Sequence, residues 1–474
     1  MPLILPGYVA PATADTVYTA ANSCRFEDGD SAYMHKTPGS AGNRRIFTFS
    51  AWVKRGNLTN GFWFGGGTDA QNYAQIGWSS NRMSFYDIIG NSTQVNLATS
   101  AVFRDPSAWY HVVVAVDTTQ STNTNRVKFY INGTLYEGAF DNSTYPDQND
   151  DLYFGQAEIM SVGALHYTAG TIDFFDGYLA EAVYIDGTQY AASDFGEFNE
   201  DSPTIWQPKD VSGLTFGTNG FYLDFEDSSN LGNDANGGTD LTEVNLAATD
   251  QSTDTCTNNF CTLNPLASGG NPTFSEGNLK LTRASGDGSS QKTTFSTMAA
   301  SSGKWYAEIS LDSLGSNGLI MGFANVDKSN LPNTSLGTGE DNFSAGLYSN
   351  GGPIFHTSGT TFATVGTPGG ILQLAMDLDN GYLYWGDDDT WLNSANPESG
   401  SSGTGGLAIS NLTAGDTYTF AIAIRNNAII QMNYGSPSFA ISSGNADANG
   451  YGNFEYAPPS GYYALCTKNL AEFG

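Results

Sequence analysis

Few residues in this chain are placed where they could catalyse a reaction. Of its four histidines, none lies four residues from another or beside a cysteine in the spacing of a zinc site. They are His35, His111, His166 and His356. His111 alternates with valines in WYHVVVAVD, so we predict a structural residue of a sheet there and not a catalytic base. The chain also lacks a serine elbow, a phosphate-binding loop and a dinucleotide fingerprint, and we therefore predict that it is not an enzyme.

Sugar binding is the chemistry that the composition favours. Aromatic side chains make up 13 % of the residues. An exposed ring can stack on the face of a pyranose while nearby polar groups hold the hydroxyls. The candidates for such contacts are Tyr73, Trp78, Tyr145, Tyr348, Trp385 and Trp391. For most of them the alternative is packing in a hydrophobic core.

The chain is strongly acidic, with 48 acidic and 18 basic side chains and a formal net charge of -30. Such a charge repels phosphate backbones, so nucleic acid is not expected as a partner. The carboxylates form either a solvated acidic coat or sites for a divalent cation. Asp387-Asp388-Asp389 presents the same choice between a solvated turn and a Ca²⁺ site that uses Asp387 and Asp389. No cofactor is expected to be required, and Ca²⁺ is the one that the residues would suit.

The elements that must position these residues read as β-strands. FTFSAWVK, KWYAEISL and TYTFAIAI alternate apolar and polar residues with the period of a strand. WYHVVVAVD is apolar on both faces, which predicts a central strand covered on both sides. Asn132-Gly133 and Asn380-Gly381 predict hairpins, and the chain is expected to turn back again at Asn426-Asn427. These signals predict an all-β protein with two tandem antiparallel β-sandwiches of the jelly-roll type.

A length of 474 residues and a shift in composition divide the chain into four parts. Residues 1–18 are predicted to be an N-terminal arm that docks into a partner, and residues 19–205 and 271–474 to be the two sandwiches. Residues 206–270, rich in Gly, Asn and Asp, are predicted to be a connector. In that connector, Cys256 and Cys261 form either a local disulfide or two inert thiols. No stretch is apolar enough to span a membrane, so membrane insertion is not expected.

The strand segments carry two family resemblances. FTFSAWVKRG, WYHVVVAVD, VKFYINGTLY, LYFG and FFDGYLAEAVYIDG, in that order, resemble the laminin-G-like branch of the concanavalin A-like lectin/glucanase superfamily over residues 20–190. KWYAEISL, MGFANVD, LAMDLDNGYLYWG and YTFAIAI resemble a SPRY domain, which belongs to the same jelly-roll class but usually has a basic hairpin tip where this chain has three aspartates. Laminin-G-like domains often bind calcium at the sandwich rim, which implies a site involving residues such as Asp141 or Asp147. Hydrolases of the superfamily use a Glu-x-Asp-x-x-Glu strand, and no Glu in this chain is followed by Asp two places on.

The most specific resemblance lies between the sandwiches. DFGEFNEDSPTIWQPKDVSG, GFYLDFEDSSNLGNDA and TNNFCTLNPL are similar to connectors of structural proteins from tailed phages, especially marine ones. This implies a virion appendage, either a tail fibre, a head fibre or a capsid decoration, which assembles in the host cytoplasm and is then extracellular. Expected partners are other virion proteins, reached through the N-terminal arm, and host-surface glycans; a homo-oligomer is expected, with a trimer favoured. The alternatives are a purely structural capsid or tail component that makes only protein–protein contacts, and a polysaccharide depolymerase.

Overall fold

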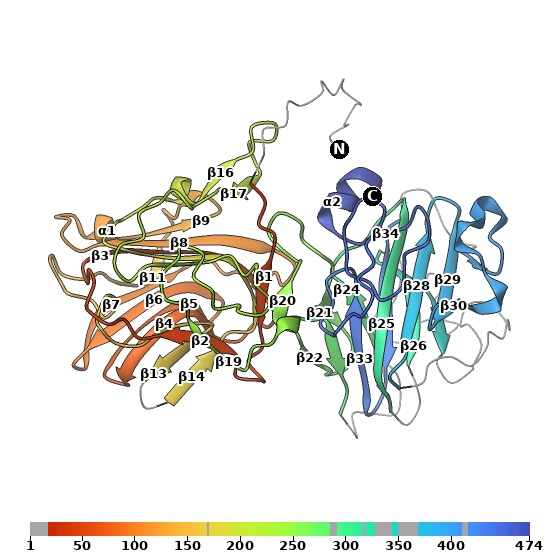
Figure 1. The fold of residues 1–474 in the computed structure, drawn as a ribbon, viewed down its shortest axis with the longest axis horizontal. Coiled ribbons are helices and arrows are strands. Elements are labelled where there is room, and N and C mark those ends of the chain that lie inside the picture. Colours follow the sequence, from red (N-terminus) through yellow and green to blue (C-terminus); the bar gives the residue numbers. More distant parts are fainter. Residues whose placement is uncertain are drawn as a thin grey trace.

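The computed structural model describes residues 18–167, 170–284, 292–315, 319–327, 344–348, 368–409 and 416–474. Nearly all elements in these residues are strands, which form two bodies that lie side by side (Figure 1). The prediction of an all-β protein with two tandem, mainly antiparallel β-sandwiches is confirmed. Residues 1–17 of the predicted arm, and His356, lie outside the described residues.

The first domain packs an eight-stranded sheet on a ten-stranded sheet. The eight-stranded sheet contains β1 (Ser23–Phe26), β3 (Ile46–Arg55), β8 (Trp109–Asp117), β9 (Val127–Ile131), β10 (Thr134–Leu135), β15 (Gly177–Asp186), β18 (Phe221–Leu223) and β20 (Gln251–Ser252). The ten-stranded sheet contains β2 (Tyr33–Lys36), β4 (Gly61–Asp69), β5 (Asn72–Ser79), β6 (Arg82–Ile89), β7 (Ser92–Thr99), β11 (Phe140–Thr144), β12 (Met160–Val162), β13 (Ala164–Tyr167), β14 (Gly170–Phe174) and β19 (Thr242–Val244). The short helices of this domain are α1 (Asn123–Arg126), η1 (Ala192–Asp194) and η2 (Ala248–Asp250).

Strands β3 and β8 show how the alternation sets the layers. The four apolar residues on one face of β3, from Phe47 to Val53, all lie in the core between the two sheets, as predicted. Alternate valines of β8 enter the same core, whereas Val113 and Ala115 face a second apolar cluster on the outer side of the eight-stranded sheet. Phe195 and Phe216 belong to that cluster, so the chain after β15 covers the outer face of the sheet. The prediction of a central strand that is buried on both sides is therefore confirmed.

Residues 206–252 are part of the first domain and residues 263–268 form a strand of the second, so the prediction of a connector over residues 206–270 is corrected for these parts. Strand β18 pairs with β15, β19 with β2 and β20 with β1. Five apolar residues of this polar segment are buried in the core of the first sandwich: Phe221, Leu223, Phe225, Leu231 and Leu241. The prediction failed because a segment rich in Gly, Asn and Asp needs only a few such anchors to be held on a sheet that already exists.

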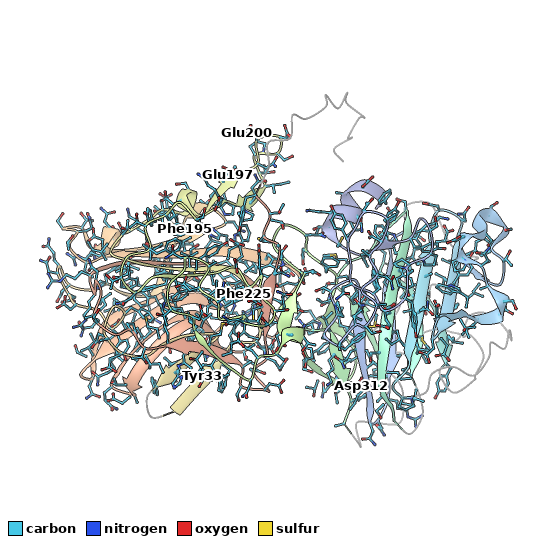
Figure 2. All side chains as sticks on the ribbon, viewed as in Figure 1. Tyr33, Phe195, Glu197, Glu200, Phe225 and Asp312 are labelled. Carbon is cyan, nitrogen blue, oxygen red and sulfur yellow. The ribbon has the colours of Figure 1, made fainter. Side chains whose placement is uncertain are left out.

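Strands β16 (Gly196–Phe198) and β17 (Trp206–Pro208) form a separate two-stranded sheet. In Figure 2, Phe195 lies at the base of this hairpin and Glu200 near its tip, which projects from the first domain. Phe198 and Ile205 on the hairpin are 46 % and 56 % exposed, although its Trp206 packs on the outer cluster. The hairpin is thus anchored at one end and free at the other.

The second domain packs a five-stranded sheet on a nine-stranded sheet. The five-stranded sheet contains β21 (Leu263–Ser268), β24 (Lys292–Ser296), β26 (Ile320–Asn325), β27 (Ser344–Tyr348) and β32 (Tyr418–Ile424). The nine-stranded sheet contains β22 (Thr273–Ser275), β23 (Lys280–Thr282), β25 (Lys304–Leu314), β28 (Ile371–Asp377), β29 (Tyr382–Asp387), β30 (Thr390–Trp391), β31 (Leu407–Ala408), β33 (Ala428–Asn433) and β34 (Tyr463–Ala464). The helices are η3 (Leu392–Ser394), η4 (Pro397–Ser402) and the C-terminal α2 (Thr467–Phe473). Alternate residues of β25 and β32 form the core between the sheets, as predicted.

The predicted turns have different outcomes. At Asn132-Gly133, both residues have positive φ (46° and 79°) and Ile131 pairs with Thr134, as a type I′ hairpin requires. Asn380-Gly381 also joins two paired strands, β28 and β29. The expectation that the chain pairs back on itself at Asn426-Asn427 is corrected, because β32 and β33 belong to opposite sheets and the turn carries the chain across the core.

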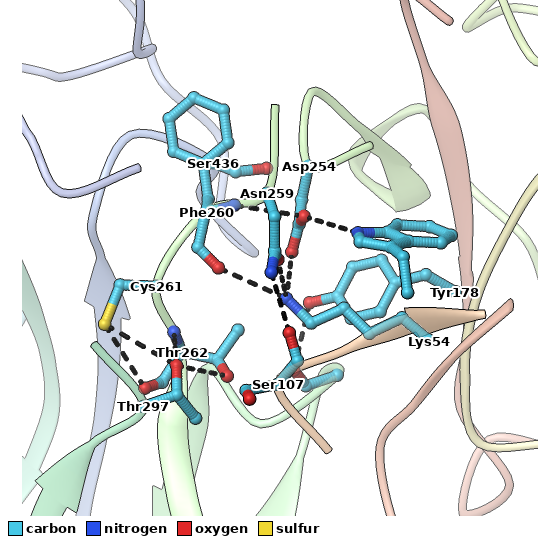
Figure 3. Close-up of polar contacts among 12 residues, drawn as sticks. Lys54, Ser107, Tyr178, Asp254, Asn259, Phe260, Cys261, Thr262, Thr297 and Ser436 are labelled. Atoms are coloured by element: carbon cyan, nitrogen blue, oxygen red, sulfur yellow. Dashed lines mark hydrogen bonds and ion pairs between the residues drawn. The ribbon is translucent and has the colours of Figure 1, made fainter. Parts of the chain in front are cut away.

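The two domains meet at a buried lysine (Figure 3). Lys54, near the end of β3, donates from Nζ to Asp254 Oδ2 at 2.7 Å, to Asn259 Oδ1 at 2.8 Å and to the Phe260 carbonyl at 3.2 Å. The other oxygen of Asp254 accepts from Trp109 Nε1 and from the Phe260 amide, both at 3.1 Å. The side chains of Lys54 and Asp254 are 1 % and 2 % exposed. Residues 254–260, which follow β20, thus form a joint packed on the first domain.

Further contacts hold the second domain to the first. The Tyr178 hydroxyl donates to the Gly277 carbonyl at 3.0 Å, and Asn278 Nδ2 donates to the Gly56 carbonyl at 2.7 Å. Arg25, which is 1 % exposed, lies 3.2 Å from Glu276. These buried polar contacts make the two sandwiches one structural unit.

Candidate functional site

Two of the predicted sugar-contacting tryptophans are core residues, and their assignment to a binding surface is corrected. Trp78 is 1 % exposed and packs edge to face on Trp63, with ring centroids 4.7 Å apart. Trp385 is also 1 % exposed, and its Nε1 donates to the Met321 carbonyl at 3.0 Å. A ring without an accessible face cannot stack on a sugar, so both residues contribute to stability.

Tyr73, Tyr348 and Trp391 are half-buried and lie on different surfaces. Tyr73 is on the outer face of the ten-stranded sheet, where its ring lies 5.6 Å from that of Tyr86 and 5.4 Å from that of Tyr167. Tyr348 packs on the outer side of the five-stranded sheet, and Trp391 on a cluster outside the nine-stranded sheet. The structure therefore does not bring the predicted aromatic residues together in one site.

Tyr145 is the predicted aromatic residue that lines a cavity. The cavity has a volume of about 380 Å³ and lies between the edge of the eight-stranded sheet, at β9 and β10, and the edge of the ten-stranded sheet, at β11. We call it the edge groove. Phe140 is the central ring of its aromatic wall, 5.3 Å from the ring of Tyr136, 5.4 Å from that of Phe129 and 6.2 Å from that of Tyr145. Each pair is close to perpendicular, which is a favourable aromatic packing.

The edge groove combines this aromatic wall with polar groups. Lys128, Glu137 and Ser143 line it, and Leu135 exposes 39 % of its surface there. The Tyr136 hydroxyl is fixed, because it donates to the Ala139 carbonyl at 2.9 Å and accepts from the Ser100 and Ala101 amides in the loop after β7. Burial raises the pKa of Tyr145, so its hydroxyl is a hydrogen-bond donor at neutral pH. Rigid rings and polar groups around a cavity of this size are typical of a small-ligand site.

In the described residues, none of the aspartates predicted to bind metal belongs to a group of three possible side-chain ligands. Asp141 pairs with Arg82 at 2.5 Å, and Asp147 is an exposed turn residue. Asp388 and Asp389 are the two central residues of the hairpin between β29 and β30, with φ of 44° and 63°. This explains the acidic run, since aspartate tolerates positive φ in such a turn. Metal binding by Asp387 and Asp389 stays a prediction.

Sequence reasoning missed an acidic cluster beside the domain boundary. Glu27 and Asp28 follow β1, Asp176 precedes β15, and these strands pair with Phe26 opposite Gly177. Oxygen atoms of the three carboxylates lie within 4.8 Å of one another. Asn57 Nδ2 donates to Asp28 at 2.9 Å and to Asp176 at 3.0 Å, which holds two of the carboxylates in place. Only strand pairing joins these residues, so no local motif could have revealed them.

The carboxylates of this cluster are held out of water and near one another. Burial raises the pKa of Glu27 to about 7, in spite of hydrogen bonds from the Glu276 and Gly29 amides. Burial, and then the charge of Glu27, raises the pKa of Asp176 well above its ordinary value. A bound cation would offset both the burial of these carboxylates and the repulsion between them. An all-oxygen donor set suits a hard ion such as Ca²⁺.

His111 is a structural residue, as predicted. It is 1 % exposed, and its ring bridges Ser50 Oγ and Trp206 Nε1, both at 3.0 Å. The indole can only donate, so His111 Nδ1 must accept and Nε2 must carry the proton toward Ser50. In this tautomer the imidazole cannot take a proton from the serine, which is the reverse of a catalytic serine–histidine pair.

The other reactive side chains are also explained by packing. His35 and His166, far apart in sequence, lie on neighbouring strands with ring centroids 5.2 Å apart, and burial lowers the pKa of each. All four cysteines are free thiols, so the structure has no disulfide between Cys256 and Cys261. Burial raises the pKa of Cys261 to about 11, which keeps that thiol protonated and unreactive. In the described part of the chain, no helix has the length and apolar character needed to cross a membrane.

Comparison with known proteins finds a family match within the first domain. A family model described as the concanavalin A-like lectin/glucanases superfamily matches residues 28–182. The first domain has a lectin-like fold. No curated protein matches the chain.

Among solved structures, similar chains include three with low sequence identity. The PSpry domain of TRIM65 is 16 % identical with a TM-score of 0.28, over 36 % of this chain and 91 % of that one. The SPRY domain of human HERC1 is 12 % identical with a TM-score of 0.27, over 36 % of this chain and 96 % of that one. A putative carbohydrate-binding protein from Bacteroides ovatus is 17 % identical with a TM-score of 0.31, over 47 % of this chain and 58 % of that one.

His111 should make stability depend on pH. Burial lowers its pKa from 6.5 to about 3 in the folded protein, so between these values the unfolded chain binds a proton that the folded protein does not. The stabilisation is complete above pH 6.5 and falls by about 1.4 kcal/mol per pH unit as the pH drops below that value. We expect urea unfolding from pH 7 to pH 4 to show a steeper loss for the wild type than for His111→Gln.

The matched control is His35→Gln, which replaces a half-exposed ring. It should change the slope less than His111→Gln does. Parallel stability curves for the wild type and His111→Gln would contradict the assignment of a buried neutral imidazole.

Proposed function

We propose that the protein is a non-enzymatic glycan-binding protein whose first domain holds a sugar in the edge groove. The observation that carries the proposal is the position of Tyr145, a half-buried ring in a cavity of about 380 Å³ within the domain that has a lectin-like fold. The aromatic wall of the groove suits the apolar face of a pyranose. Lys128, Glu137 and Ser143 supply the donors and acceptors that sugar hydroxyls need.

A groove of this kind binds one or two sugar rings weakly. Stacking on one ring contributes about 0.5–1.5 kcal/mol beyond the area that it buries. Useful affinity for a surface therefore requires several copies acting together, since linked weak sites gain avidity from their effective concentration. We propose a homo-oligomer, with a trimer favoured, as the form that presents several edge grooves to one polysaccharide.

The biological setting that we propose is a virion appendage of a tailed phage, either a tail fibre, a head fibre or a capsid decoration. It rests on the resemblance of three segments to phage connectors, among them DFGEFNEDSPTIWQPKDVSG, which includes the projecting β16–β17 hairpin. In this setting the N-terminal arm docks into other virion proteins and the sandwiches face the host. The protein would assemble in the host cytoplasm and act outside it.

The alternative is a structural capsid or tail component with protein partners only. Antibodies against the protein should label intact virions and block adsorption if the appendage proposal holds. Failure to label intact particles that contain the protein would favour the structural alternative. Release of reducing ends from host polysaccharide would instead show a depolymerase.

Replacing Tyr145 should weaken glycan binding. With an array of host-surface polysaccharides as the probe, we expect Tyr145→Ala to reduce affinity about tenfold for the glycans that the wild type binds, because 1.4 kcal/mol corresponds to a factor of ten. Leu135→Ala, at the exposed rim of the groove, should give a smaller loss in the same direction.

Tyr86→Ala is the matched control, since Tyr86 is a half-exposed tyrosine of the same domain on the outer face of β6. Its glycan affinity should equal that of the wild type, and circular dichroism should show that all three variants are folded. An array on which the wild type binds nothing, or equal losses for Tyr86→Ala and Tyr145→Ala, would reject the edge groove as the glycan site.

We also propose that Ca²⁺ binds at Glu27, Asp28 and Asp176 and stabilises the first domain. The support is the set of carboxylate oxygens within 4.8 Å of one another, together with the raised pKa of Glu27. These residues lie at one end of the β1–β15 pair, so an ion there would stabilise the pairing of the first strand with the sheet.

Calcium should therefore raise the melting temperature. A ligand present at a hundred times its dissociation constant adds about 2.7 kcal/mol to stability. We expect the rise to disappear in Asp176→Asn, to persist in Asp141→Asn, and to shrink below pH 7 as Glu27 takes up a proton. Equal melting temperatures in CaCl₂ and in EDTA for the wild type would rule the site out.

A further inference from the structure

The buried lysine at the joint lies next to a side-chain amide. Lys54 Nζ is 2.8 Å from Asn259 Oδ1, and these residues are 205 positions apart in the sequence. Nζ is also 2.7 Å from Asp254 Oδ2 (Figure 3). An amine, an amide carbon and a carboxylate are the three groups that an amide exchange needs. Here the partly buried amide of Asn259 meets a lysine and an aspartate whose side chains are 1 % and 2 % exposed.

We propose that Lys54 and Asn259 form an isopeptide bond that covalently joins the first domain to the joint. Asp254 is the proton carrier for this step. Both reacting groups belong to the same chain, so the protein modifies itself.

The first step moves a proton within the ion pair. The Lys54 ammonium transfers one proton to Asp254 Oδ2, across the 2.7 Å hydrogen bond, and leaves a neutral amine and a neutral acid. Exclusion of water favours this transfer, because a buried ion pair has lost the hydration that stabilises its charges. The Tyr178 ring, 5.6 Å from Nζ, forms one wall of the site.

The second step makes and breaks one bond each. The lone pair of Nζ attacks Cγ of Asn259 from above the amide plane, which a rotation of the carboxamide out of its in-plane hydrogen bond allows. Asp254 gives the proton that it gained in the first step to Nδ2 and then takes one from Nζ, while the Cγ–Nδ2 bond breaks and ammonia leaves. In the arrangement before reaction, Nδ2 donates to the Ser107 carbonyl at 2.7 Å, a hydrogen bond that the rotation must break. Atoms and charge balance without an oxidant or a co-reactant.

Asn259 is held in place for this reaction. Its backbone amide donates to Thr467 Oγ1 at 3.0 Å, and its carbonyl accepts from the Thr467 amide at 2.9 Å, so α2 of the second domain fixes it on one side. Asp254 is fixed through its other oxygen by Trp109 and the Phe260 amide. Reactants held at contact distance gain the rate advantage of an intramolecular reaction.

Lys304 provides the contrast within the same chain. It lies 2.9 Å from Asp377, and Asn380 Nδ2 donates to the same carboxylate at 2.9 Å, but the Lys304 side chain is 21 % exposed. The 2.8 Å contact between Nζ and the Asn259 amide oxygen, at a lysine that is 1 % exposed, is the feature that sets Lys54 apart.

The experiment is intact-mass spectrometry of the full chain under denaturing conditions. The wild type should weigh about 17 Da less than its residues predict, the mass of one ammonia. Tandem spectra should place the loss in a branched peptide that contains both Lys54 and Asn259, which separates it from the same loss at an Asn-Gly succinimide. Cleavage between the two residues should leave the fragments joined on a denaturing gel.

Single substitutions test the role of each residue in the reaction. Lys54→Met, Asn259→Ala and Asp254→Asn should each have full mass, whereas Lys304→Met should keep the loss of ammonia. Asn259→Asp should lose about 18 Da, because water leaves in place of ammonia. A wild type of full mass, a loss located in any other peptide, or a loss that persists in Lys54→Met would overturn the proposal. The wild-type measurement decides the matter even where a variant does not fold.

Discussion

A lysine charge removed from water between two sandwiches is the constraint on which the arrangement of this protein depends. A buried ion is tolerated only when each of its hydrogen bonds is made. Removing one partner of a buried ion pair lowers the free energy of unfolding by about 3–5 kcal/mol. Lys54 finds its acceptors in Asp254, Asn259 and Phe260, a stretch of seven residues. That stretch must therefore follow one path over the first domain. The second domain begins at the end of that stretch, so the Lys54 ion pair sets its position together with the contacts of Tyr178, Asn278 and Arg25.

The same requirement explains why the polar region before the joint is folded. Strand β20 ends at Ser252, two residues before Asp254, and it pairs with β1. Ser252 also contacts Ser436 of the second domain, with 2.7 Å between the hydroxyl oxygens. A flexible connector could not deliver Asp254 to a buried ammonium at a defined distance. Pairing of β18, β19 and β20 to the first sandwich fixes the chain before it reaches Lys54.

Sequence periodicity predicted the local structure well and the long-range contacts poorly. The alternation in β3 and β25 identifies their buried faces correctly, since period two is a property of the strand itself. The burial of Trp78 was also available from the sequence, because it continues the alternation of Ala74 and Ile76. No such signal places Glu27 beside Asp176 or Lys54 beside Asn259. Those pairs depend on which strands become neighbours, and many pairings are compatible with the same alternation. The edge groove was predicted in part. Tyr145 was a candidate from the sequence, but the cavity itself was not, because it exists only where both sheets end at short, exposed edge strands.

The place of Lys54 on β3 also determines how the molecule carries load. Strand β3 is hydrogen-bonded along its length to β8 on one side and to β15 on the other. With Lys54 joined to Asn259 as proposed, tension applied through the second domain enters β3 near its end and is spread over both ladders at once. Many hydrogen bonds then resist sliding together instead of opening one after another. A pull on the second domain would thus reach the middle of the eight-stranded sheet of the first domain. The edge strands that line the edge groove would lie outside the path of the force.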